Sequence, residues 1–140
     1  METARHLSIQ RLVRPLPGVS VADVSIDLWL RLAAELRLLI GDGGFLPLYR
    51  RSVQLSAASF PWLLPVSEAL PLASGDTRFA NLKISIDQQD AREASQASAF
   101  LLNTFIDTLA RLIGETLTTG ILRSAWANTP FDPIDKEPSS

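Results

Sequence analysis

The sequence contains no cysteine and a single histidine, His6. Without cysteine the chain forms no disulfide, no thiolate metal site and no cysteine nucleophile, which agrees with a reducing compartment. One histidine near the N-terminus cannot supply a histidine-rich zinc or iron site, and a catalytic triad requires a histidine that is buried and oriented. We therefore expect a non-enzymatic protein without cofactors or metal ions.

A strong excess of one charge sign is also missing. The 140 residues include 13 Lys and Arg and 15 Asp and Glu, which gives a formal net charge of -2. A chain of this charge has no overall basic field that would attract nucleic acid. Arginine outnumbers lysine by 11 to 2, which we interpret as a sign of a GC-rich bacterial genome.

Long hydrophobic runs are absent as well. No segment reaches about 18 uncharged apolar residues, and Pro61 and Pro65 interrupt the nearest candidate, residues 52–67. The first residues lack the apolar run of a signal peptide, because Arg5 and Arg11 interrupt them. We therefore predict a cytoplasmic protein that does not insert into a membrane.

Leucines at helical spacing dominate what the sequence does contain. Apolar residues recur every three or four positions and predict helices over 21–40, 45–58, 76–88, 91–113 and 115–127. The last of these helices either follows a kink at Gly114 or continues the preceding helix through it. The residues expected to face the core of the two longest helices are Leu28, Leu32, Leu36 and Leu39, and Leu102, Phe105, Leu109 and Leu112.

These helices predict an all-α bundle of four to five helices. A proline-rich, irregular crossover over 59–76 connects the two halves of the bundle. We expect residues 1–18 to form an N-terminal arm with solvated basic residues, 19–127 to form a single helical domain, and 128–140 to form a flexible C-terminal tail.

One pattern suggests an internal repeat. The residues Leu-Ile-Gly-Asp at 39–42 resemble Leu-Ile-Gly-Glu at 112–115, and the same offset of 73 residues pairs Arg50 with Arg123. Glycine at such a joint lets two helices bend or approach each other. A genuine repeat predicts two pseudo-repeated helical hairpins, and a chance alignment of two leucine-rich helices is the alternative.

Two apolar stretches are candidates for a partner surface. The first is the proline-rich crossover with Phe60, Trp62, Leu63 and Leu64, and the second is the end of the last helix with Trp126. Exposed aromatic and aliphatic patches usually mark surfaces that bind partners. The alternative is that these residues fold across the end of the bundle and complete the core.

Three arginines are candidates for contacts with an acidic partner. Arg50, Arg51 and Arg123 lie in the two short helices, and they form one basic patch if these helices lie side by side. The alternative is that each arginine makes an ordinary surface pair with Asp or Glu.

Our leading hypothesis is a non-enzymatic regulatory or adaptor subunit. It binds a protein partner or a second copy of itself, as a homodimer, through apolar helix faces with an arginine rim. The alternative is a small-molecule sensor whose pocket lies between the helical halves and is lined by Trp29, Phe79, Phe100 and Phe105. A third hypothesis is an enzyme whose active site is completed by another subunit.

Overall fold

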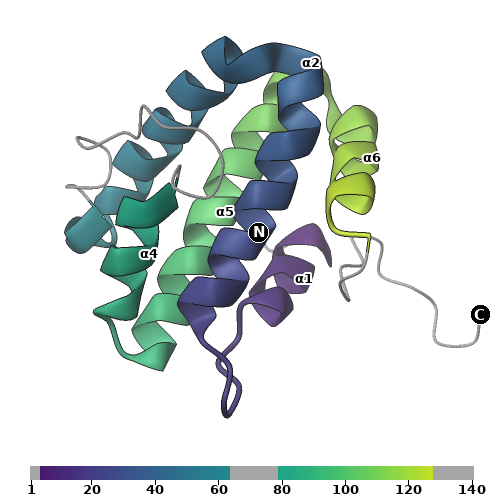
Figure 1. Cartoon of the computed structure of the whole chain (residues 1–140). Coiled ribbons are helices and arrows are strands. Elements are labelled where there is room, and N and C mark those ends of the chain that lie inside the picture. Colours follow the sequence, from purple (N-terminus) through teal and green to yellow (C-terminus); the bar gives the residue numbers. More distant parts are fainter. Residues whose placement is uncertain (1–3, 64–78, 128–140) are drawn as a thin grey trace, which may run out of the picture.

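The computed structural model describes residues 4–63 and 79–127, and this part of the chain is all-α with no β-strand (Figure 1). The prediction of an all-α fold is therefore confirmed. None of the described helices is long and apolar enough to cross a membrane. The helices are α1 (Ala4–Leu12), α2 (Val21–Ala57), the 3-10 helix η1 (Pro61–Leu63), α4 (Ala80–Asp87), α5 (Ala91–Ile113) and α6 (Glu115–Ala125).

Side-chain caps explain where the two long helices begin. The Ser20 hydroxyl accepts a hydrogen bond from the backbone N–H of Asp23 at 3.2 Å, so α2 begins at the residue after Ser20. The Asp90 carboxylate accepts from the backbone N–H of Glu93 at 2.8 Å at the start of α5. The predicted bounds of α5, 91–113, agree with the structure.

Two glycines interrupt the helices. Gly41 has φ 67° and ψ 175° inside α2, and Gly114 has φ 94° and ψ 156° between α5 and α6. Only glycine adopts this backbone region readily, so each helix breaks there and the chain turns back (Figure 1). A single residue makes the break in α2, whereas the sequence predicted a joint of four residues, 41–44.

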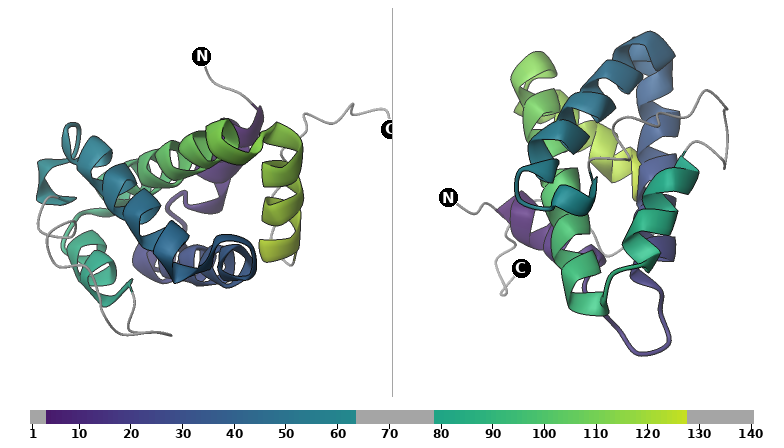
Figure 2. Two further views of the ribbon diagram at one scale, coloured as in Figure 1. Left: turned by 90° about the horizontal axis from the view of Figure 1, so that it is seen from above. Right: turned by 90° about the vertical axis from the view of Figure 1, so that its left-hand side faces the viewer.

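The two glycine joints are 73 residues apart, which is the offset of the predicted repeat. At each joint a long helix is followed by a shorter one. The first segment of α2, which precedes Gly41, and helix α5 both terminate at the same end of the bundle (Figure 1). The second segment of α2 (42–57) and α6 lie on opposite sides (Figure 2). The wider repeat, with the pairing of Arg50 and Arg123, stays a prediction.

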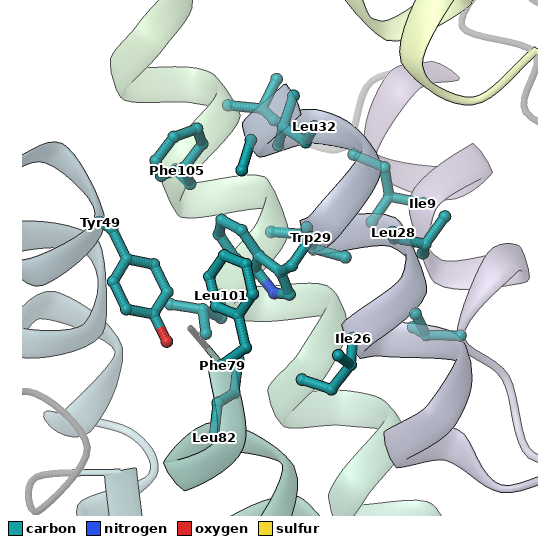
Figure 3. Close-up of a cluster of buried hydrophobic side chains, with 14 of the residues drawn as sticks. Ile9, Ile26, Leu28, Trp29, Leu32, Tyr49, Phe79, Leu82, Leu101 and Phe105 are labelled. Atoms are coloured by element: carbon teal, nitrogen blue, oxygen red, sulfur yellow. The ribbon is translucent and has the colours of Figure 1, made fainter. Parts of the chain in front are cut away.

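An aromatic cluster fills the space between α2, α4 and α5 (Figure 3). The Trp29 ring lies 5.2 Å from Tyr49, 5.8 Å from Phe79 and 5.0 Å from Phe105, measured between ring centroids. Phe45 stacks on Tyr49 at 5.9 Å. All five rings are buried. Burial raises the pKa of the Tyr49 hydroxyl far above its usual value, so this group stays neutral.

The N-terminal residues add to this core. Helix α1 packs on α5, and its Ile9 side chain and the neighbouring Val13 are buried. Arg5 is only 8% exposed, so the expectation of a solvated basic arm is wrong at this residue. The physical reason is that carboxylates of α5 and α6 pair with its guanidinium.

Replacing Phe105 with alanine should lower the free energy of unfolding by about 3–5 kcal/mol, because the loss of a central ring leaves a cavity. Denaturant unfolding followed by circular dichroism measures this change. Ile84→Ala is the control, since Ile84 is exposed on α4 and its loss should change stability by no more than about 0.5 kcal/mol. Similar losses in both variants would contradict the central role of Phe105.

Two glycine substitutions in the C-terminal part of the structure should have opposite effects. Gly114→Ala should lower the free energy of unfolding by about 1–3 kcal/mol, because alanine is strained at φ 94°. Gly120→Ala should raise it by up to about 1 kcal/mol, because Gly120 lies within α6 and an added Cβ meets no atom within 4 Å. Thermal melts of both variants provide the measurement, and a stabilised Gly114→Ala variant would contradict the assignment of strain.

Candidate functional site

Two of the predicted partner-binding residues belong to the core. Leu63 and Trp126 are each 1% exposed. The indole N–H of Trp126 donates to the backbone oxygen of Leu28 at 3.0 Å, which attaches the end of α6 to α2. Leu63 and Trp126 are therefore not available to a partner in this conformation, and they complete the core instead. Leu64 lies outside the described residues.

Phe60 and Trp62 remain half-buried at the surface. The Trp62 indole N–H donates to Glu93 Oε2 at 3.0 Å and connects η1 to the start of α5. The Phe60 ring meets Trp62 at 6.3 Å and Phe100 of α5 at 5.7 Å, both edge to face. This segment thus presents aromatic side chains beside α5 (residues 91–113).

The three candidate arginines do not form one patch. Arg50 and Arg51 are exposed on the second segment of α2, beside Leu46. Arg123 is exposed on α6, which lies on the other side of the bundle (Figure 2). The condition for one basic patch, two short helices side by side, is not met, because the long helices lie between them and Trp126 attaches α6 to the first segment of α2.

The predicted interior pocket is filled by its own lining residues. Trp29, Phe79 and Phe105 are buried and contact one another in the aromatic cluster (Figure 3). Phe100 is separate from them and is 41% exposed. The expectation that these four residues surround one pocket between the helical halves is therefore wrong, since close packing of the rings leaves no room for a ligand among them.

An open cleft lies instead between α1, Phe60 and α5. Its volume is about 700 Å³. Phe60 and Phe100 provide an aromatic wall, and His6 and Asp107 lie at another part of the lining. The remaining polar residues that line the cleft are uncharged: Gln10, Ser95, Gln96, Asn103 and Thr104.

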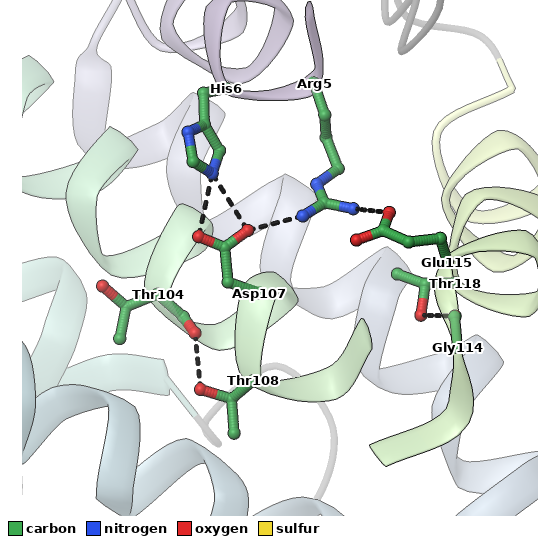
Figure 4. A network of polar contacts seen from close by, with 8 residues as sticks. All are labelled: Arg5, His6, Thr104, Asp107, Thr108, Gly114, Glu115 and Thr118. Carbon is green, nitrogen blue, oxygen red and sulfur yellow. Dashed lines mark hydrogen bonds and ion pairs between the residues drawn. The ribbon is translucent and has the colours of Figure 1, made fainter. Parts of the chain in front are cut away.

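An ionic network holds α1 beside this cleft (Figure 4). The guanidinium of Arg5 pairs with Asp107 of α5 and with Glu115 of α6. His6 Nε2 lies 2.9 Å from Asp107 Oδ1 and 2.8 Å from Oδ2. Asp107 therefore binds two side chains of α1 at once, and its lone pairs are largely used within the protein.

The network was not predicted from the sequence because its members are far apart in the chain. Asp107 and Asn103 are on the helix face opposite the leucines, and that pattern is typical of a solvated surface. The apolar residues Ile9 and Val13 were the one indication that the N-terminal segment packs against another helix, and both are buried. In the described ranges, no three histidine, aspartate or glutamate side chains form a group that could hold a metal ion.

A second unusual feature is a set of exposed leucines at the end of the bundle where the glycine joints lie. Leu38 is 86% exposed, Leu112 69% and Leu39 50%. Leu39 and Leu112 were expected to face the core, and this expectation is wrong because the neighbouring Ile40 and Ile113 pack against the core in the same helical turns and leave the leucines exposed. Leu117, in the first turns of α6, is also exposed.

The chain matches no protein-family model, and comparisons with curated proteins and with solved structures find no match.

Asp107→Asn should loosen α1 more than Glu115→Gln does. Asp107 binds both Arg5 and His6, whereas Glu115 binds Arg5 and is much more exposed. We expect the first variant to lose about 1–3 kcal/mol of stability, because it leaves the buried Arg5 with weaker pairing. Hydrogen exchange of the α1 amides measures the loosening, and equal exchange in the two variants would contradict this ranking.

Proposed function

We propose that this chain is a non-enzymatic interaction subunit that binds a protein partner through the leucine-rich end of its bundle. The observation that supports this proposal is the exposure of Leu38, Leu39 and Leu112 in the last turns before the two glycine joints. A single exposed leucine is ordinary in a soluble protein. Several at one end of two packed helices are typical of a surface that a partner covers.

Charged neighbours support the same proposal. Arg37 precedes Leu38, Arg111 precedes Leu112, and both arginines are exposed. Arginine is enriched in protein interfaces, where its long side chain packs beside apolar groups and its guanidinium binds carboxylates. This pair is not the arginine rim of the sequence hypothesis, which consisted of Arg50, Arg51 and Arg123.

We propose a second copy of this chain as the first partner of the leucine-rich end. An apolar patch on one copy meets the same patch on another when a two-fold axis passes through it, and such isologous dimers are the commonest oligomers. Burying one exposed leucine in such a contact contributes about 1.5–3 kcal/mol. Three leucines from each copy then supply much of the driving force for a dimer.

The double variant Leu38→Glu with Leu112→Glu tests this proposal. We expect light scattering after size exclusion to show a dimer of the wild-type protein at about 100 µM. At this concentration a dimer with a dissociation constant in the micromolar range is populated. The double variant should be monomeric, because like charges replace the apolar contact. Its helicity should be unchanged, since both positions are exposed.

Ile84→Glu is the matched control, because Ile84 is also exposed but lies on α4. It should leave the dimer intact. A monomeric wild-type chain would exclude the homodimer. A dimer that survives the double variant would show that another surface is used.

A further inference from the structure

The cleft between α1, Phe60 and α5 is a second candidate site, separate from the leucine-rich end. We infer that it binds a small aromatic molecule that carries an amine or another N–H donor, and that it discriminates against carboxylates. The volume of about 700 Å³ is in the range of small-molecule sites in proteins, about 300–1,000 Å³.

The aromatic wall favours a ring in the ligand. Phe60 and Phe100 meet at 5.7 Å with their planes inclined by 65°. Phe100 is nonetheless 41% exposed, so part of its ring faces solvent beside the cleft. Aromatic rings attract one another most strongly in edge-to-face and offset arrangements, and a third ring in the cleft extends the existing pair in this way.

The uncharged polar wall favours a hydrogen-bond donor. The side-chain oxygen of Asn103 is buried and has no hydrogen-bond partner among the described residues. A buried acceptor without a partner is unfavourable. This oxygen is closed to solvent, so a ligand N–H reaches it only when the Asn103 side chain turns toward the cleft, and that contact then removes the deficit. Thr104, one residue further along α5, supplies a hydroxyl to the same lining.

The charges around the cleft disfavour an anion. His6 and Asp107 are the only ionisable residues among the described residues that line it. The nearby Arg5 guanidinium is buried and already bound by two carboxylates. Arg92 is exposed on α5 but does not belong to the lining. A carboxylate in the cleft therefore finds no unpaired guanidinium or lysine among the described lining residues, whereas an ammonium group is attracted by the aromatic faces of Phe60 and Phe100.

Four small molecules of similar size, added to the 140-residue chain, test the preference for a ring and for an N–H donor. They are 2-phenylethylamine, 3-phenylpropionamide, 3-phenylpropionate and 2-cyclohexylethylamine, each titrated to 10 mM and followed by 1H–15N NMR spectra. We expect the amine and the amide to shift the resonances of Phe100 and Asn103. The carboxylate should bind at least tenfold more weakly, and the cyclohexyl compound at least threefold more weakly.

Two variants locate the binding and reverse its charge preference. Phe100→Ala should weaken binding of the aromatic amine at least fivefold, whereas Ile84→Ala on α4 should leave it unchanged. Gln96→Lys adds a cation to the lining at an exposed position, so the carboxylate should then bind more tightly than the amine. Circular dichroism verifies that each variant is folded.

Several results would overturn the inference. One is the absence of shifts with every probe at 10 mM, and another is equal affinity of wild-type protein for the amine and the carboxylate. Unchanged affinity in a folded Phe100→Ala variant would also overturn it, because the aromatic wall would then have no part in binding. None of these results depends on the dimer contact, which is tested by Leu38 and Leu112.

Discussion

The edge-to-face contact between Trp29 and Phe105 determines how the first segment of α2 lies against α5. Their centroids are 5.0 Å apart and their planes make an angle of 83°. Because protein interiors are close-packed, these rings also set where Tyr49 and Phe79 fit, and with them the second segment of α2 and α4. The interior is thereby occupied by its own side chains. Both proposed sites lie at the surface for this reason.

The position of α1 follows from a different constraint, the burial of a cation. The Arg5 guanidinium is taken from water and needs acceptors that replace its hydration. Asp107 and Glu115 provide them from two helices, so one side chain fixes α1 relative to both α5 and α6. Ile9 adds apolar contact beneath the network. The cleft exists because α1 is held along one part of α5 while Phe60 covers another.

The glycine joints connect the fold to the leucine-rich end. A residue in the backbone region of Gly41 or Gly114 ends one helix abruptly and lets the next one turn back within a single residue. The long helices thus reach the end of the bundle before the chain reverses. There Ile40 and Ile113 pack against the core, while Leu38, Leu39 and Leu112 are exposed. These leucines therefore lie on the outer side of the last helical turns, which is the surface of the proposed dimer contact.

Local patterns in the sequence determined the helices and the breaks between them. The leucine periodicity predicted the bounds of α5, and the two glycines marked the joints at 41 and 114. Both are local properties, because helical spacing and backbone strain depend on neighbouring residues. The tertiary structure decided that Trp126 is core and that a cleft forms beside α1. It also decided that α6, which carries Arg123, and the second segment of α2, which carries Arg50, lie on opposite sides of the bundle (Figure 2). Periodicity identifies the apolar face of a helix but not the element that covers it, and residues such as Arg5 and Asp107, 102 positions apart, meet only when the whole chain packs.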